Sequence, residues 1–354
     1  MFANKSLGFK IGFGFGVVVL IAIFLGGLAV YSMNGVASVA HVLAEQNVPA
    51  VSVANDVERS SLATMYETRG YAYSVEKEFL DKAKANLVDV RAFLKKAREH
   101  GDKFQMKVLQ ENAALAQKSV DQYVKLLDDT VQATEAMGVQ KEESLKAADS
   151  YMKICDEYLK SQTQSLKQEI KQITSGTPAA ATAKDDDDKT NEERLLERYR
   201  KIELCNEIID RGNWIRLGTW QSIATRDPKL FRDTQKLFEQ VNARLDELKD
   251  NTKQPVNLKQ IEECRAAGKA YNDCMTAFLK EWERREVLNK SRGEVAAQVL
   301  AAAKGTATTG MKDTAESSEK AIASLATASL TMIVGLLIGV ALAIGIALFI
   351  TRGI

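Results

Sequence analysis

Two apolar stretches decide the fold of this chain: Ile11 to Tyr31 (IGFGFGVVVLIAIFLGGLAVY) and Leu330 to Ile350 (LTMIVGLLIGVALAIGIALFI). Neither contains a charged residue, and each is long enough for a helix that crosses a bilayer, which takes about 20 apolar residues. We therefore expect transmembrane helices at 11–31 and 330–350. A cleaved signal peptide is the alternative for the first stretch, but its apolar run exceeds the roughly 7–15 residues of a signal core.

The charges beside these stretches predict the orientation of the chain. Lys5 and Lys10 precede the first stretch, and Arg352 follows the second. Because cytoplasmic flanks carry an excess of Lys and Arg, we expect both termini in the cytoplasm. Residues 32–329 would then form a domain outside the inner membrane, in the periplasm or beyond it.

The composition favours an all-α protein. The chain has 354 residues, a charged fraction of 27%, a net charge of +1 and only 4 prolines. This balance gives no basic surplus for nucleic acid and no acidic excess typical of disorder. A chain poor in Pro and rich in Ala, Glu, Lys and Leu is typical of helices.

Turn-forming residues divide the region between the spans into six predicted helices. The expected ranges are about 33–73, 78–98, 104–173, 191–225, 228–249 and 256 onward into the second span. Within them we expect a kink at Pro49, a break at His100-Gly101-Asp102, and soft points at Gly305 and Gly310.

The order medium, short, very long occurs twice, which indicates an internal repeat. Residues 55–97 superpose on 206–248 without a gap, with matched apolar phase at Val57/Ile208 and Leu87/Phe238. Two unrelated amphipathic hairpins could also be phased together, but the shared element lengths favour duplication. At about 1.5 Å of rise per residue, the helix lengths predict two stacked four-helix bundles that share two long helices.

The two ends of the chain resemble a known family. The start SLGFKIGFGFGVVVLI is similar to the first span of bacterial methyl-accepting chemotaxis receptors, and the end ALFITRGI resembles the junction of their second span with the HAMP linker. The duplicated bundles between them resemble the helical bimodular (HBM) sensor domain. The resemblance implies a receptor that binds small molecules, above all carboxylates, forms a parallel homodimer in membrane lipid, and is truncated before HAMP, without its downstream signalling module.

The predicted organisation follows. The order is an N-terminus at 1–10, a transmembrane helix at 11–31, a sensor domain at 32–329, a transmembrane helix at 330–350, and the start of the HAMP linker at 351–354. The membrane-proximal module comprises about 32–125 plus 293–329, and the distal module about 126–292. The alternatives are the input domain of a sensor histidine kinase and a membrane-tethered helical scaffold without a ligand.

Motifs of catalysis are absent from the sequence. The chain has only 2 histidines, His41 and His100, and neither belongs to an HExxH pattern. It also contains no phosphate-binding loop, nucleophile elbow or CxxC motif. We therefore expect no enzyme activity, no cofactor and no metal site.

Arginines and aromatic residues mark a candidate ligand site in the membrane-proximal module. The guanidinium group is planar and always charged, so it suits a carboxylate. The resemblance implies that arginines on the first helix bind the ligand, and Arg59 lies at a suitable distance from the membrane. The candidates are Arg59, Tyr66, Arg69, Tyr123 and Lys304. The alternative for Arg59 and Arg69 is that they are solvated surface charges.

A denser group of such residues predicts a site in the distal module. Arg216 and Trp220 are four residues apart and therefore share a helix face. Heights counted along the helices bring all 3 tryptophans together, as pocket walls or as core. The candidates are Arg211, Trp214, Arg216, Thr219, Trp220, Trp282 and Arg285.

The cysteines suggest a disulfide in the distal module. Counted from the far tip, Cys155, Cys205 and Cys274 fall at similar heights, whereas Cys264 lies higher. An exported domain permits a bond from Cys155 to Cys205 or to Cys274. The alternative is that the cysteines are buried thiols, which behave as small apolar residues.

One short acidic run has two interpretations. The segment Asp185 to Lys189 (DDDDK) matches a protease-tag sequence, so it could be an engineering scar. It could equally be an acidic start to the next helix, where negative charge is favourable near the N-terminal end of the helix dipole.

Overall fold

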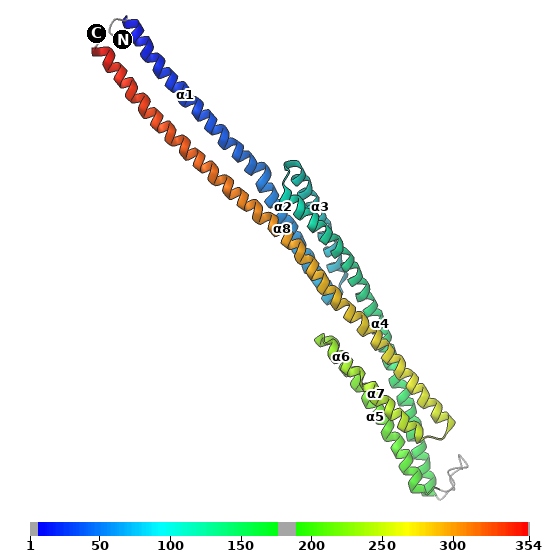
Figure 1. Cartoon of the computed structure of the whole chain (residues 1–354). Helices are drawn as coiled ribbons and strands as arrows, with labels where there is room; N and C mark the ends of the chain where they lie inside the picture. The colour runs from blue at the N-terminus through cyan, green and yellow to red at the C-terminus, as the bar shows by residue number, and fades with distance from the viewer. Residues whose placement is uncertain (1–5, 176–188, 353–354) are drawn as a thin grey trace. The chain divides into compact units, whose positions relative to one another are not determined.

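The computed structural model describes residues 6–175 and 189–352, which are almost entirely helical (Figure 1). The elements in order are α1 (Leu7–Val42), the π-helix η1 (Leu43–Asn47), α2 (Val48–Ser74), α3 (Lys77–Phe104), α4 (Lys107–Ser175), α5 (Asn191–Thr225), α6 (Pro228–Gln235), α7 (Leu237–Asp250) and α8 (Pro255–Arg352). No strand occurs among the described residues. The all-α prediction is confirmed.

The chain divides into two compact units. Unit 1 comprises Met1–Val124 and Gly293–Ile354, and unit 2 comprises Lys125–Arg292. The long helices α4 and α8 contribute residues to both units, whereas α2 and α3 belong to unit 1 and α5, α6 and α7 to unit 2.

The burial pattern agrees with the internal repeat. Val57 and Ile208 are both buried, as are the superposed pairs Val90/Val241 and Leu94/Leu245. Each unit therefore uses the same face of its corresponding helices to form a core.

The first helix changes its winding just before Pro49. Residues Leu43–Asn47 form a π-helix, in which the N–H of Val48 bonds to the carbonyl of Leu43. A proline has no N–H, and its ring clashes with the carbonyl four residues earlier, so a wider turn accommodates it. The kink predicted at Pro49 thus corresponds to a change of helix type. The ring of His100, on α3, contacts the carbonyl oxygen of Gln46 at 2.9 Å beside this turn.

Three hairpin turns use a left-handed residue that is not glycine. Val75, Gln105 and Arg226 have φ values of 62°, 55° and 56°. The break predicted at His100-Gly101-Asp102 is wrong, because α3 continues to Phe104 and ends at Gln105. Gly101 serves a different purpose: a Cβ there would lie 3.0 Å from Cγ of Gln110, so glycine lets α3 and α4 approach closely.

Two further boundaries differ from the sequence prediction. The helix predicted at 228–249 is divided at Lys236 into α6 and α7. The soft points predicted at Gly305 and Gly310 are not breaks, because α8 runs through both. A Cβ at Gly310 would lie 2.7 Å from Cγ2 of Val51, so this glycine allows α8 and α2 to pack closely.

The start of α5 is fixed by a capping box. The Thr190 hydroxyl accepts a hydrogen bond from the Glu193 backbone N–H at 3.2 Å, and the Glu193 carboxylate accepts one from the Thr190 N–H at 2.8 Å. Residues 185–188 of the acidic run lie outside the described residues, as do 1–5 and 353–354 of the predicted termini.

Two helices contain stretches that are long and apolar enough to cross a membrane: α1, near the N-terminus, and the last part of α8. These stretches pack on each other at a small-xxx-small pair of glycines. A Cβ at Gly335 would lie 2.4 Å from Cδ2 of Leu25, and one at Gly339 would lie 3.3 Å from Cγ2 of Ile21. Glycine at this spacing lets two apolar helices come close together.

Candidate functional site

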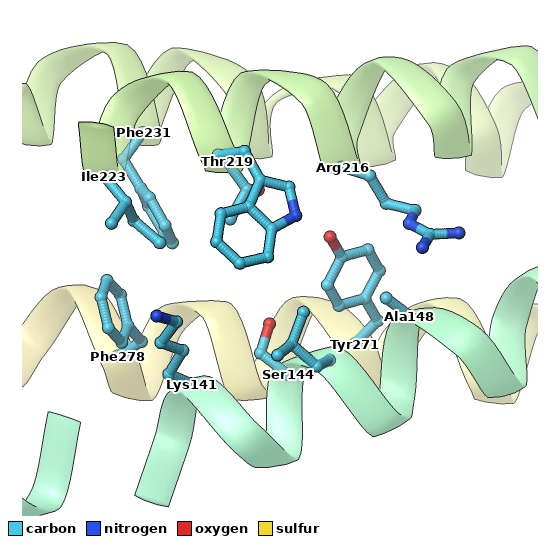
Figure 2. A pocket seen from close by; sticks show the side chains of 11 residues that line it. Lys141, Ser144, Ala148, Arg216, Thr219, Ile223, Phe231, Tyr271 and Phe278 are labelled. Atoms are coloured by element: carbon cyan, nitrogen blue, oxygen red, sulfur yellow. The ribbon is translucent and has the colours of Figure 1, made fainter. Parts of the chain in front are cut away.

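A cleft in unit 2 brings together side chains from four helices (Figure 2). Its polar and aromatic lining residues are Lys141, Ser144, Arg216, Thr219, Trp220 and Tyr271. Its apolar lining residues are Leu145, Ala148, Ile223, Phe231 and Phe278.

Helical spacing places these residues on one face of each helix. On α5, Arg216, Thr219 and Ile223 follow one another at intervals of three and four residues, and on α4 the same intervals connect Lys141, Ser144 and Ala148. In Figure 2 the α5 side chains project toward those of α4, with Tyr271 and Phe278 of α8 beside them.

Two cations give the cleft a positive character. The Lys141 ammonium lies over the Trp220 ring, 5.3 Å from its centroid, which is a cation–π contact. The Arg216 guanidinium lies 3.3 Å from the Asp149 carboxylate; the Arg216 side chain is half-buried, whereas that of Asp149 is exposed. Because no acidic residue lines the cleft, an anion entering it meets Lys141 directly and competes with Asp149 for Arg216.

Tyr271 forms the inner wall of the cleft and interacts with residues of α5. Burial raises the pKa of Tyr271, while a hydrogen bond with Thr219 and the charge of Arg216 oppose that rise. The Thr219 hydroxyl donates to the Ile215 carbonyl at 2.7 Å. The phenol is therefore neutral at physiological pH and is held beside the guanidinium by its neighbours.

The cleft has little free space in this structure. Its enclosed volume is about 20 Å³, which is room for about one water molecule. An organic anion therefore requires the walls to separate. Trp220 is 47% exposed, so its indole can move outward without leaving a core.

The structure brings together only part of the predicted distal group. Arg216, Thr219 and Trp220 line the cleft, whereas Arg211, Trp214, Trp282 and Arg285 do not.

The predicted convergence of the three tryptophans is wrong. Trp282 is buried in the core of unit 2, edge-on to Phe231 and Phe278 at 5.9 and 5.7 Å. Trp214 is 60% exposed on the outer face of α5. Only Trp282 therefore fits the alternative that these residues are core.

Among the polar residues of the cleft, sequence reasoning missed Lys141, Ser144 and Tyr271. The available signal was the spacing of 141, 144 and 148 on α4, which matches 216, 219 and 223 on α5. This signal is weak, because every amphipathic helix of this length contains such triplets.

The predicted proximal residues do not meet inside unit 1. Tyr123 is buried, but Arg59, Tyr66, Arg69 and Lys304 are exposed. Arg59 forms an ion pair with Asp56 at 2.5 Å. In the single chain, the arginines therefore match the alternative that they are surface charges, and their role in ligand binding stays a prediction.

All four cysteines are free thiols in this structure. The thiol of Cys205 lies 3.5 Å from the carbonyl oxygen of Cys155. Interaction with Cys155 raises the pKa of Cys264, so the thiol of α8 beside Cys155 belongs to Cys264. Cys274 instead faces Glu143, about 18 Å along α4 from Cys155, which is too far for the pairing of Cys155 with Cys274.

The heights predicted for the α8 residues relative to α4 and α5 were wrong for one reason. Arg200 lies more than two turns into α5, yet it pairs with Glu247, in the last turn of α7, at 2.5 Å. The α7–α8 turn therefore lies beside a part of α5 that is about two turns from its N-terminus, and not beside the N-terminus itself. Counting both hairpins from one common tip misplaced every residue of α8 in unit 2.

The buried thiols are poorly reactive. Burial raises the pKa of Cys205 to about 12, and interaction with Cys155 together with burial raises the pKa of Cys264. Thiolates are therefore scarce at neutral pH. Among the described residues, no group of three His, Cys, Asp or Glu side chains is arranged to hold a metal ion.

We compared the chain with protein families, curated sequences and solved structures. No protein-family profile and no curated protein sequence matches the chain. A solved structure with a similar helical arrangement is described as the crystal structure of the TorS sensor domain in complex with TorT in the presence of TMAO. The superposition covers 76% of this chain and 99% of that chain, with a TM-score of 0.47 and 13% identity.

Proposed function

We propose that this chain is the ligand-sensing and transmembrane portion of a bacterial chemoreceptor, and that the cleft in unit 2 binds a small carboxylate. The observation that carries this proposal is the pair of cations, Lys141 and Arg216, beside an aromatic wall on helices of one unit. A guanidinium, an ammonium and a neutral phenol together match the charge and hydrogen-bonding needs of a carboxylate.

The proposal includes a membrane topology. The apolar stretches 11–31 and 330–350 would span the inner membrane, with 32–329 outside. Because α8 runs unbroken from unit 2 through the second span, a change in its position on ligand binding would pass to whatever follows the span. The expectation that the chain catalyses no reaction stays a prediction.

A homodimer is supported by an exposed stripe on α2. Positions 48, 52, 55, 59, 62, 66, 69 and 73 alternate intervals of four and three residues, and all are exposed. This is the spacing of a coiled-coil seam. Its apolar members are Val48, Leu62, Tyr66 and Tyr73, and its polar members are Ser52, Asn55, Arg59 and Arg69.

The ligand proposal can be tested by calorimetric titration of the full chain in lipid nanodiscs with organic acids, amino acids and amines. We expect a carboxylate to bind, and Arg216→Gln to weaken it by about 10-fold or more, because a charge-assisted hydrogen bond contributes about 1.5–3 kcal/mol. Asp149→Asn should strengthen binding, since it removes the competing carboxylate. Arg284→Gln is the matched control, because Arg284 is similarly exposed but lies outside the cleft.

Three outcomes decide between the candidate functions. Absence of binding by every compound, with the protein folded, would favour the helical scaffold without a ligand. Equal affinity of Arg216→Gln and the parent chain would refute the site. The sequence that follows Ile354 in the parent gene distinguishes a chemoreceptor from the input domain of a histidine kinase.

The homodimer can be tested by disulfide crosslinking in a Cys274→Ser background. Leu62→Cys should crosslink between copies, because equivalent seam positions face each other in a parallel pair. Val88→Cys, which is 67% exposed on α3, should not. Equal crosslinking at both positions would argue against this seam.

A further inference from the structure

A second, chemically different cavity lies at the centre of unit 1. It is partly open to the surface and has about 20 Å³ of free space, which is room for about one water molecule. Its lining residues come from α2, α3, α4 and α8. They include Ser61, Met65, Tyr123 and Ala296, and none of the nine lining residues is Lys, Arg, His, Asp or Glu. A charged ligand there would lose its hydration without gaining a counter-charge, so the wall selects against ions.

Among the polar groups that line the cavity, the Ser61 hydroxyl is the one that is both fully buried and without a partner. The Ser61 hydroxyl is buried and makes no hydrogen bond, while the residue as a whole is 7% exposed. The neighbouring Thr64 hydroxyl, by contrast, donates to the Ser60 carbonyl at 2.8 Å. Among the buried Ser and Thr hydroxyls that the structure describes, Ser61 is therefore unusual, because a buried hydroxyl normally finds an acceptor.

The corresponding place in unit 2 is filled. The internal repeat matches Ser61 to Gly212, where a Cβ would lie 2.6 Å from Cε1 of Tyr151 and 2.8 Å from Sδ of Met152. The Tyr151 ring is fully buried against that glycine. Unit 2 thus packs its core at this position, whereas unit 1 leaves a cavity with an unpartnered donor.

We propose that the centre of unit 1 is a binding site for a small uncharged organic molecule that carries one hydrogen-bond acceptor, such as a short-chain ketone or alcohol. The Ser61 hydroxyl donates to the acceptor, and the aliphatic side chains enclose the apolar body. The flexible thioether of Met65 gives way to make room, since methionine adapts its shape at small cost. This site is separate from the carboxylate cleft proposed for unit 2.

The test is methyl NMR of the full chain in nanodiscs, with ¹³C-labelled methionine methyl groups. Met65 lines the cavity, while Met275 is buried in the core of unit 2 beside Thr219 and therefore reports on the carboxylate cleft. With 2-butanone we expect a saturable shift of the Met65 resonance and none of Met275. Butyrate at the same concentration, which has the same number of carbons but a charge, should leave Met65 unchanged.

Two variants distinguish the contribution of the cavity volume to binding from that of the Ser61 hydrogen bond. Ala296→Val fills the cavity and should abolish the saturable shift. Ser61→Ala keeps the space but removes the buried hydroxyl and leaves that of Tyr123, so it should weaken 2-butanone binding by about 2- to 10-fold. Xenon needs no donor, so its binding should be unchanged in Ser61→Ala.

The outcomes that overturn the proposal are distinct from those that overturn the carboxylate cleft. Arg216→Gln should leave the binding of 2-butanone unchanged, whatever it does to carboxylates. Failure of every neutral compound to shift Met65 in folded protein would refute this site. An ordered water as sole occupant would also refute it: Ser61→Ala would then lower the melting temperature by stranding the water, whereas an unpartnered hydroxyl predicts an equal or higher one.

Discussion

Units 1 and 2 share an arrangement of helices but differ at their centres. The internal repeat matches Met65 in the uncharged cavity of unit 1 to Arg216 in the charged cleft of unit 2, and Ser61 to Gly212. In unit 2, a tyrosine fills the middle of the core, and the polar groups gather at a narrow cleft to one side of it. In unit 1, the middle contains a small uncharged cavity, and the predicted arginines are on the surface. The two halves of a repeat can thus keep the same pattern of apolar residues, while a few substitutions move the candidate ligand site from the centre of one unit to the side of the other.

The largest expected effect is on the filled core of unit 2. Trp282→Ala should lower the free energy of unfolding by about 3–5 kcal/mol, because it leaves a cavity beside two aromatic rings. Trp214→Ala should change it by no more than about 0.5 kcal/mol, since that indole is on the surface. Denaturant unfolding followed by circular dichroism checks both. Comparable losses would contradict the separation of core and surface tryptophans.

A somewhat smaller loss is expected where unit 2 is most tightly packed. Gly212→Ala should cost about 1–3 kcal/mol, because the added methyl group overlaps the buried Tyr151 ring. The control is Gly138→Ala in α4, where nothing lies within 4 Å of the added Cβ. That change should raise stability by about 0.5–1 kcal/mol, since alanine restricts the unfolded chain and favours helix. If Gly212→Ala is neutral, Tyr151 does not fill unit 2 in the way described.

Alkaline pH should distinguish the two units, because all 4 cysteines lie in unit 2. Burial raises the pKa of Cys205 from 9.0 to about 12. The folded state therefore favours the neutral thiol: its stabilising contribution is complete below pH 9 and is lost progressively between pH 9 and about 12.

Tryptophan fluorescence reports on unit 2, which contains all 3 tryptophans. Thermal unfolding monitored this way should show a steeper loss of stability above pH 9 in the parent chain than in Cys205→Ala. The same pH dependence in both proteins would show that the Cys205 thiol is not protected by burial.

The smallest effect is expected on the outer face of unit 1. Arg59→Ala removes an exposed ion pair with Asp56, which contributes at most about 1 kcal/mol. We expect a change in melting temperature of no more than a few degrees. Carboxylate affinity measured by calorimetry should also be unchanged if the cleft of unit 2 is the sole carboxylate site. A large loss of affinity would instead place Arg59 in a ligand site, as the family resemblance implies.

The helices could be predicted from the sequence because each depends on local chemistry. Apolar periodicity, the turns near Val75 and Arg226, and the charge-free stretches at both ends all act within a few residues. The error at Gly101 shows the limit of such signals. Glycine marks either a turn or a close helix contact, and only the neighbour across the interface, Gln110, decides which.

The candidate site was less predictable, because it depends on how far one hairpin is displaced along another. Arg216, Thr219 and Trp220 were found by their shared face, but Lys141 and Tyr271 were missed and Cys274 was paired in place of Cys264. Helical periodicity specifies the direction in which a side chain points and carries no information on its height relative to another helix.

The sequence by itself determined the apolar stretches, the helical class and the repeated order of helices, because these follow from residues close together in the chain. Only the tertiary structure decided which positions face each other: that Tyr151 fills unit 2 at Gly212, that Ser61 borders a cavity in unit 1, and that Trp282 is core while Trp214 is surface. The physical reason is that an amphipathic helix looks much the same after every two turns. Its level against its neighbours is therefore fixed by the packing of bulky and small side chains across the interface.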